Sequence, residues 1–151
     1  MAPLFFCAPA KADVLIFHEQ LNCLTEAIYF ESRGEDFIGQ LAVANVILNR
    51  VQHVKFPDTV CEVVHEGRYW KKNPVKNQCQ FSYWCDGKSE QMQDRIALDQ
   101  AKYIATLSLA GARIQNLENV LYYHASYIRP YWINYVKRVE KIGMHIFYRS
   151  K

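Results

Sequence analysis

The sequence predicts an α+β domain that is mostly helical and has a small β-rich portion. Three observations lead to this class. Apolar residues recur with a helical period in three long segments before position 111. Strand-like alternation begins only near Val120. No internal repeat or linker divides the 151 residues, of which half are hydrophobic and 22% are charged, so a single domain with its own core is expected.

The first two helices are expected at residues 20–33 and 36–51. Gly34 follows the first helix, at the position where a left-handed residue commonly closes one. Asp36 is a candidate N-cap for the second helix. Between Asp36 and Arg50 this helix has no charge and is apolar on nearly every side. We therefore expect it to be surrounded by protein.

A turn and an irregular segment follow the second helix. Residues 56–59 form a turn that leads into a short helix, which is expected to run through Glu66 and to stop at Gly67. Residues 67–88 are polar and aromatic and show no helical period. They are expected to form a long irregular loop or a small β lobe, and loops of that length inside a compact domain are usually functional.

The last part of the chain contains one helix and then strands. A third long helix is expected at residues 89–110, ended by Gly111. From Val120 onward the sequence alternates around turns, for example at residues 136–139 and 145–148. This alternation is the source of the predicted β-rich portion.

The cysteines and the N-terminal residues bear on the compartment. Four of the five cysteines lie in the body of the chain and allow two disulfides in three connectivities: Cys23, Cys61, Cys79 and Cys85. Disulfides in an oxidising compartment are favoured over reduced core thiols. Residues 1–12 have a short apolar stretch and two small-x-small cleavage patterns, so we expect a signal-peptide remnant or a disordered N-terminus. The folded domain would then be residues 13–151 of an exported protein.

Charge and motif content exclude several classes of protein. The formal net charge is +3, from 18 Lys and Arg against 15 Asp and Glu. The basic residues are scattered rather than arranged in a stripe, so no nucleic-acid partner is expected. No stretch is long and apolar enough to span a bilayer, so no stable membrane insertion is expected. No zinc-type ligand spacing occurs, so neither a metal nor another cofactor is expected, and we expect a monomer.

One carboxylate lies where an apolar residue is expected. Leu24, Ala27 and Ile28 follow the spacing of a buried helix face, and the next position of that face is Glu31. An acid on this face would be partly desolvated, which raises its pKa and suits it to donate a proton near neutral pH. The alternative is a structural ion pair between Glu31 and Arg33 or another base.

Residues 26–51, with the sequence EAIYFESRGEDFIGQLAVANVILNRV, resemble the opening signature of the spore cortex-lytic enzyme family of cell-wall hydrolases. In that family a Tyr-x-Glu-x-Arg-Gly-Glu stretch leads into a Gly-Gln-x-Ala-Val helix that ends Ile-Leu-Asn-Arg. Further matching segments follow in the same order at residues 56–60, 79–82, 122–124 and 142–148. The resemblance therefore covers most of residues 24–148.

The resemblance implies a lysozyme-like catalytic domain that acts on the glycan strands of peptidoglycan, with Glu31 as its catalytic acid. The pair Glu31–Ser32 also resembles the Glu-Ser that begins the active site of goose-type lysozymes and lytic transglycosylases. Ser32 is therefore a candidate substrate-binding residue.

Five further residues are candidates for the substrate cleft: Gln80, Phe81, Ser82, Tyr122 and Tyr123. The amide of Gln80 and the hydroxyl of Ser82 could bind an acetamido group, and Phe81 could stack on a sugar. The alternative for residues 80–82 is an ordinary loop pinned by Cys79 and Cys85. Strand alternation directs one of the two tyrosines inward, where it would hydrogen-bond Glu31 or the substrate, or serve only as a core residue.

The count of acids bears on the reaction. Most glycosidases use two carboxylates that flank the scissile bond. Glu35 is a candidate second acid, but no Asp or Glu occupies a second clear position on a buried face. A single acid is enough in a lytic transglycosylase, where the substrate supplies the nucleophile. We therefore predict cleavage of the β-1,4 bond between N-acetylmuramic acid and N-acetylglucosamine, with 1,6-anhydro-muramoyl ends as the product.

Other activities are kept as alternatives. Simple hydrolysis by a lysozyme-type muramidase is the nearest of them. An N-acetylmuramoyl-L-alanine amidase and a non-catalytic peptidoglycan-binding module are the remaining two. The expected setting is the periplasm, the cell wall or the extracellular space, or the host wall attacked by a phage-encoded lysin.

Overall fold

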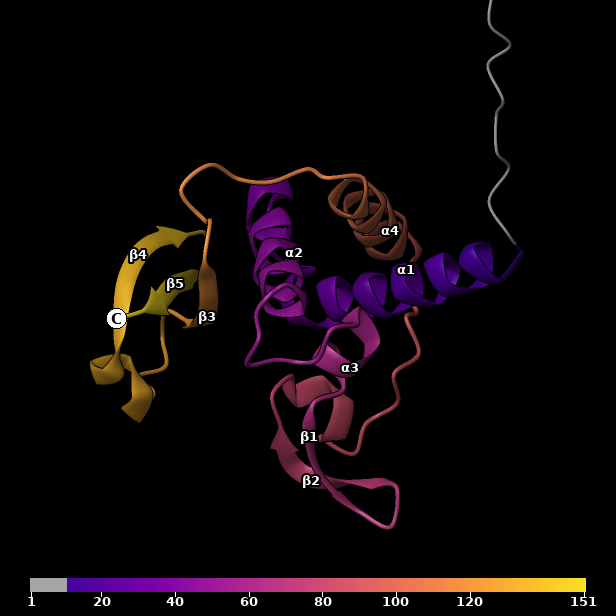
Figure 1. The fold of residues 1–151 in the computed structure, drawn as a ribbon, viewed down its shortest axis with the longest axis horizontal. Helices are drawn as coiled ribbons and strands as arrows, with labels where there is room; N and C mark the ends of the chain where they lie inside the picture. The colour runs from indigo at the N-terminus through magenta and orange to yellow at the C-terminus, as the bar shows by residue number, and fades with distance from the viewer. Residues whose placement is uncertain (1–10) are drawn as a thin grey trace, which may run out of the picture.

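The computed structural model describes residues 11–151. The helices form the body of the molecule, and two separate groups of strands extend from it (Figure 1). This confirms the predicted α+β, mostly helical class. In chain order the elements are α1 (Lys11–Ser32), α2 (Phe37–Val51), α3 (Val60–Val64), β1 (Gly67–Trp70), β2 (Asn73–Cys79), the 3-10 helix η1 (Ser82–Cys85), α4 (Arg95–Leu109), β3 (Val120–Ala125), the 3-10 helix η2 (Tyr131–Tyr135), β4 (Val136–Ile142) and β5 (His145–Ser150).

Helix α2 lies at the centre because it buries two opposite faces. One face packs with α1, α3 and α4 in the main hydrophobic core. The other face, through Ala42 and Val46, packs on Val120 and Phe147 of the sheet. In Figure 1 α2 stands between the sheet and the other helices. This confirms that the uncharged helix is surrounded by protein, as its apolar circumference predicts.

Capping residues define where the helices start. The Asp36 carboxylate accepts a hydrogen bond from the Gly39 backbone N–H at 2.8 Å, which confirms it as the N-cap of α2. Asp94 caps α4 in the same way, by accepting from the Ala97 N–H at 3.0 Å. After α4, Gly111 takes a left-handed φ of 108°, as its place after the last helical turn predicts.

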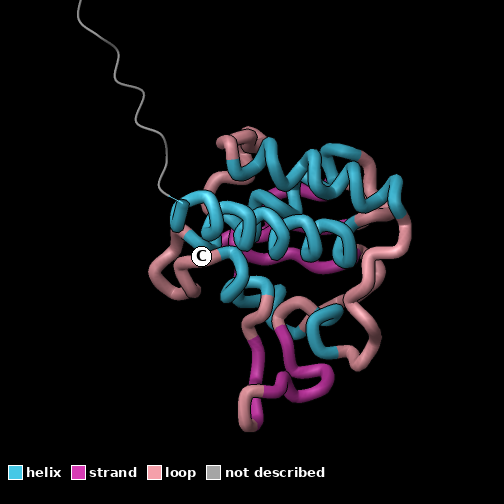
Figure 2. Tube along the Cα trace, turned by 90° about the vertical axis from the view of Figure 1, so that its right-hand side faces the viewer, coloured by secondary structure: helices cyan, strands magenta, loops and turns pink. Residues whose placement is uncertain are grey.

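The C-terminal strands form an antiparallel sheet in the order β3-β5-β4. Figure 2 shows the long helices packed as a layer beside these strands. Tyr123 of β3 pairs with Phe147 of β5, and β4 and β5 are joined by a tight turn at Gly143, where φ is +55°. The Asn49 side-chain amide of α2 donates to the backbone oxygens of Leu117 and Val120, at 2.8 and 2.9 Å. This pair of bonds ties the start of β3 to the central helix.

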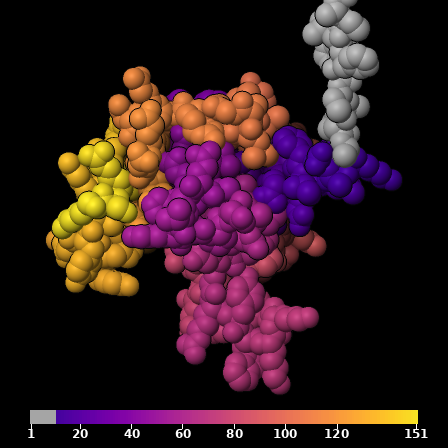
Figure 3. Space-filling model, viewed as in Figure 1, coloured from indigo at the N-terminus to yellow at the C-terminus, as the bar shows by residue number. Residues whose placement is uncertain are grey.

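Residues 67–88 form a small β lobe, which is one of the two predicted outcomes. The lobe consists of the antiparallel β1–β2 hairpin followed by η1, and the hairpin projects from the body as a separate extension (Figure 3). A disulfide joins Cys79, the last residue of β2, to Cys85, the last residue of η1, and so closes the segment between them. A second disulfide joins Cys23 of α1 to Cys61 of α3. The four cysteines of the body thus pair in one of the three allowed connectivities.

Helix α1 starts at Lys11, nine residues before the predicted start at position 20. Residues 11–19 are exposed, including the apolar residues Val14 to Phe17. Because all nine of these residues are exposed, this part of the helix has no buried stripe, and helical periodicity does not reveal it. Of the predicted signal remnant or disordered segment, residues 1–10 lie outside the described part of the chain.

Other predicted element boundaries were wrong. The third helix starts at Arg95 rather than at residue 89, because the Asp94 side chain caps it there. The short helix α3 ends at Val64, and Gly67 begins β1 instead of stopping a helix. Gly34 follows α1 without the left-handed conformation expected of it. None of the helices in residues 11–151 is long and apolar enough to cross a membrane.

Candidate active site

A cleft of about 1090 Å³ opens between the sheet and the segment around η1. Most of its lining comes from the end of α1, from residues 80–89, from β3 and from the segment 127–136, and the end of α2 and β5 add the rest together with Lys55 and Lys151. Six of the predicted site residues line it: Glu31, Gln80, Phe81, Ser82, Tyr122 and Tyr123. Residues far apart in the sequence are therefore brought to one groove, although the predicted residues Ser32 and Glu35 are outside its lining.

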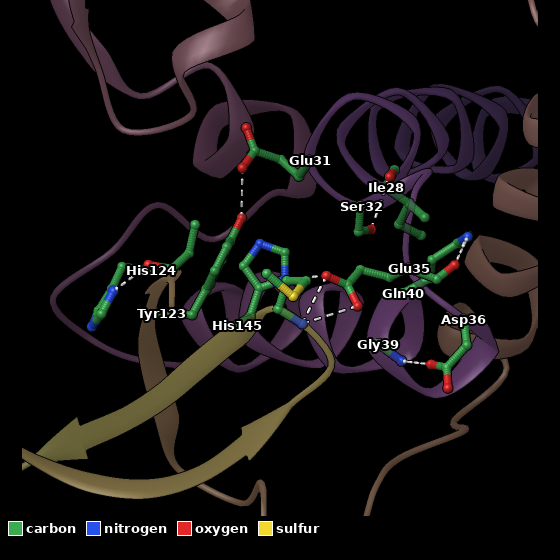
Figure 4. A network of polar contacts seen from close by, with 12 residues as sticks. Ile28, Glu31, Ser32, Glu35, Asp36, Gly39, Gln40, Tyr123, His124 and His145 are labelled. Carbon is green, nitrogen blue, oxygen red and sulfur yellow. Dashed lines mark hydrogen bonds and ion pairs between the residues drawn. The ribbon is translucent and has the colours of Figure 1, made fainter. Parts of the chain in front are cut away.

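Glu31 is in the last turn of α1 and its side chain faces β3 (Figure 4). The hydroxyl of Tyr123 donates a hydrogen bond to Glu31 Oε2 at 2.9 Å. Burial raises the pKa of Glu31 above its ordinary value, and the bond from Tyr123 and the charge of Arg50 oppose part of that rise. The raised pKa agrees with the position of Glu31 on the buried face of the helix.

Tyr123 and Tyr83 both remain neutral O–H groups. Burial and the nearby Glu31 raise the pKa of Tyr123 well above its usual value. Burial and Glu26 raise the pKa of Tyr83, which lines the cleft from η1. Since neither phenol ionises at neutral pH, Tyr123 acts as a hydrogen-bond donor toward Glu31.

Arg50 is a cleft residue that the sequence reasoning missed. Its Nε donates to the Leu121 backbone oxygen at 2.8 Å, at a bulge where β3 skips its pairing with β5. The guanidinium lies over the rings of Phe56 and Phe81, 5.1 and 5.4 Å from their centres. The signal in the sequence was a lone Arg at the end of an otherwise uncharged helix.

The predicted segment 80–82 contributes in two ways. Gln80 and Ser82 are exposed at the cleft and free to reach a substrate. Phe81 is only 2% exposed and packs beneath Arg50, so its ring belongs to the floor of the cleft. Tyr122 lines the wall beside Trp132, a residue with no recognisable signal in the sequence.

Ser32 and Glu35 have other partners. The hydroxyl of Ser32, 3% exposed, donates to the Ile28 backbone oxygen at 2.9 Å. Glu35 contacts the β4–β5 turn, where it accepts from the Met144 N–H at 3.0 Å. Arg33 donates to the Tyr29 hydroxyl at 3.0 Å.

The cleft has an excess of positive charge. Its carboxylates are Glu31 and Asp86, and its cations are Arg33, Arg50, Lys55, Lys88 and Lys151. The sequence did not predict Asp86 as a cleft residue. Its side chain accepts a hydrogen bond from the Lys88 backbone N–H at 2.8 Å. Across residues 11–151, no group of three His, Cys, Asp or Glu side chains is placed to hold a metal ion.

The fold and the cleft together define a class. A mainly helical body presents a desolvated carboxyl group in an open groove bounded by a small sheet, which is the arrangement of a lysozyme-like catalytic domain.

Comparison with known proteins identifies the family. The chain belongs to the Cell Wall Hydrolase family, whose model matches residues 34–148. The spore cortex-lytic enzyme of Bacillus cereus is 32% identical over 127 residues, which are 84% of this chain and 43% of that protein. The spore cortex-lytic enzyme of Bacillus subtilis is 28% identical over 130 residues, 86% of this chain and 37% of that protein. The chain thus spans less than half the length of these curated relatives.

Two solved structures share the fold over most of the chain. The catalytic domain of the germination-specific lytic transglycosylase SleB from Bacillus anthracis matches with a TM-score of 0.68 and 30% identity, over 98% of this chain and 100% of that one. The catalytic domain of the Bacillus cereus SleB protein matches with a TM-score of 0.67 and 32% identity, over 87% of this chain and 91% of that one. The family match begins after Glu31, so the role of Glu31 is argued from its geometry and from the signature around it.

Proposed function

We propose that this domain degrades peptidoglycan as a lytic transglycosylase, with Glu31 as its single acid and base. The observation that supports this most directly is the desolvated Glu31 carboxyl group in the cleft, held by the Tyr123 hydroxyl. The relatives named as spore cortex-lytic enzymes, and the SleB domain named as a lytic transglycosylase, favour the same activity.

The reaction needs one proton donor that is then regenerated. Protonated Glu31 gives its proton to the glycosidic oxygen between the muramoyl and glucosaminyl residues, and the bond from C1 to that oxygen breaks. The ionised Glu31 then takes the proton of the muramoyl 6-hydroxyl, and O6 bonds to C1. The product is a 1,6-anhydro ring, and no water is consumed.

The surroundings of Glu31 suit both halves of this cycle. Burial raises the pKa of Glu31 and so favours the protonated acid at the start, because the charged form is poorly solvated there. The Tyr123 hydroxyl and the Arg50 charge favour the carboxylate once the proton has left. Opposing influences of this kind bring the pKa of a carboxyl group toward the working pH.

The cleft chemistry fits a polymer that carries sugars and carboxylates. Gln80 and Ser82 are exposed polar groups that suit acetamido and hydroxyl substituents. Five cationic side chains line the cleft against two carboxylates, which favours glycan strands with acidic muramoyl or peptide groups. The glycan strand is therefore the proposed partner, bound by a monomer. The two disulfides support a site of action outside the reducing cytoplasm, either as an exported enzyme or as a phage lysin on the host wall.

Digestion of purified peptidoglycan tests the proposal. Mass spectrometry should find anhydro-muramoyl ends and no incorporation of oxygen from labelled water. The Glu31→Gln variant should lose nearly all turnover while keeping the native circular dichroism. Retention of most activity by this variant would refute the assignment of Glu31.

Hydrolysis to reducing muramoyl ends is the second candidate. Asp86, the other carboxylate of the cleft, is the observation that favours it, because a second acid could activate a water molecule. Reducing ends that carry labelled oxygen, together with loss of turnover in Asp86→Asn, would establish this route. Release of free N-terminal alanine would point instead to an amidase, and binding without cleavage to a non-catalytic module.

A further inference from the structure

We propose that Glu35 is a positioning residue that holds Tyr123 in contact with Glu31 by anchoring the β4–β5 turn. The inference rests on the proposed function, in which Glu31 is the acid. In Figure 4, Glu35, His145, Tyr123 and Glu31 follow one another across the space between the sheet and the end of α1.

Glu35 joins the β4–β5 turn to the segment that follows α1. Its two carboxylate oxygens accept from the Met144 backbone N–H, at 3.0 and 3.2 Å. Its Oε1 also lies 3.4 Å from His145 Nδ1, and both side chains are only 10% exposed. Hydrogen bonds to an ionised acceptor are stronger than neutral ones, and more so where water is excluded. The turn is therefore held to a residue four positions beyond Glu31.

The turn is shaped to receive this carboxylate. Gly143 has a φ of +55°, which a residue with a side chain rarely adopts. A Cβ added at Gly143 would overlap Oε2 of Glu35. Glycine is thus needed here both for the conformation and for the space that Glu35 occupies.

His145 and β5 connect the turn to Tyr123. The ring of Tyr123 meets the ring of His145 edge to face, with 5.2 Å between their centres and an interplanar angle of 86°. Phe147, two residues further along β5, is the strand partner of Tyr123. A shift of the turn would therefore move both the ring beside Tyr123 and the strand that pairs with it, and the 2.9 Å bond to Glu31 would lengthen.

The position of Glu35 does not suit direct catalysis. Its oxygens are engaged by the Met144 N–H, and it is outside the residues that line the cleft. An effect of Glu35 on the reaction would therefore pass through Tyr123.

This route has a measurable consequence for Glu31. The groups that face Glu31 are Tyr123 from β3, Arg50 from α2 and Tyr83 from η1. The bond from Tyr123 lowers the pKa of Glu31, so losing it raises that pKa further. Since protonated Glu31 starts the reaction, the alkaline limb of kcat/KM would move to higher pH.

A double-mutant cycle tests the route, with Glu35→Ala, Tyr123→Phe and the double variant. The matched control is Glu140→Ala, an exposed glutamate of the same hairpin. Two readouts are the pH profile of kcat/KM on soluble glycan strands and the titration of Glu31 followed by carbon-13 NMR. We expect each single variant to raise the titration midpoint of Glu31 and to lower kcat about tenfold, the rate change that corresponds to one bond of moderate strength. In the pH profile and in the Glu31 titration, the double variant should match Tyr123→Phe alone, and Glu140→Ala should match the wild type.

Further variants keep the test decisive. Glu35→Gln retains an oxygen that can accept from the Met144 N–H, so it should restore most of the activity. If Glu35→Ala does not fold, Gly143→Ala displaces the carboxylate from the other side and should raise the Glu31 midpoint in the same way. A folded Glu35→Ala with an unchanged Glu31 midpoint, or an additive double variant, would overturn the inference. Absence of cleavage by the wild type would instead count against the proposed function, while the NMR titration still tests the positioning role.

Discussion

The hydroxyl of Tyr123 donates a 2.9 Å hydrogen bond to Glu31 although the two residues are 92 positions apart in the sequence. The first residue belongs to the sheet and the second to the end of the long N-terminal helix. The packing of the sheet against the helices therefore brings the hydroxyl group to the carboxyl group.

Replacing Glu31 by Gln should stabilise the protein at neutral pH. The pKa of Glu31 is raised on folding, so its contribution to stability is fully present below pH 4.5 and is lost as the pH rises through the raised value. Gln cannot ionise and escapes that loss. We expect thermal unfolding at pH 7 to occur about 2 to 4 °C higher, the shift that about 1 kcal/mol produces in a domain of this size. No gain is expected at pH 4, and an equal gain at both values would show that burial of the charge is not the cause.

Replacing Arg50 by Met should destabilise the fold and impair the site together. The Leu121 carbonyl oxygen would lose its partner at the β3 bulge, at a cost of about 2 to 3 kcal/mol in the free energy of unfolding. The pKa of Glu31 would also rise, because the Arg50 charge no longer favours the carboxylate. Urea unfolding measures the first effect and the pH profile the second. Arg50→Lys keeps the charge, so its pH profile of activity should stay closer to that of the wild type than its free energy of unfolding does. A Met variant within about 0.5 kcal/mol of wild type would contradict the structural role.

The two disulfides should differ in what their removal costs. Cys23 and Cys61 are 38 residues apart, so removing this bridge should cost about 4 kcal/mol through the entropy of the unfolded chain. Cys79 and Cys85 are 6 residues apart, for which the same relation gives about 2 kcal/mol. The shorter loop contains the cleft residues 80–83, so its paired Ser variant should lose more activity than its stability loss explains. Guanidinium unfolding of the two paired Ser variants measures the loss of stability, and turnover measures the loss of activity. A greater loss of activity in the Cys23–Cys61 variant than in the Cys79–Cys85 variant would contradict the prediction.

Reversing the charge of a cleft lysine should weaken substrate binding. Lys88→Glu places a carboxylate in a groove that attracts an acidic polymer, so KM should rise about threefold to tenfold at low salt and less at high salt. Lys102→Glu, exposed on α4 and outside the cleft lining, makes the same change in net charge and is the control. Equal effects of the two variants on KM would indicate attraction by net charge alone.

Local sequence signals predicted several features well. Asp36 begins α2 and Gly111 follows the end of α4, because a cap depends on side-chain and backbone chemistry within a few residues. The position of Glu31 on an apolar stripe likewise indicated a desolvated acid, since helical spacing alone places it on that face.

The predictions failed where the deciding partner is not local. The start of α1 was missed because residues 11–19 bury no stripe, and periodicity detects only a helix that packs. The late start of the third helix has a different cause, because the Asp94 side chain caps it from within the same segment and this local signal was overlooked. Arg50 enters the cleft because a β-bulge in a distant strand presents a free carbonyl oxygen to it, which no pattern around position 50 reveals.

The sequence by itself determined the class of the fold, the buried central helix and the acid on its neighbour, because these follow from periodicity, capping and the lack of charge in one segment. Tertiary structure alone decided which tyrosine meets Glu31, that Phe81 forms a floor under Arg50, and that Glu35 binds the β4–β5 turn. Those relationships depend on the register of the sheet and on how it packs against α2. Register and packing are set by contacts summed over the whole domain, so they are not written in any short stretch of the chain.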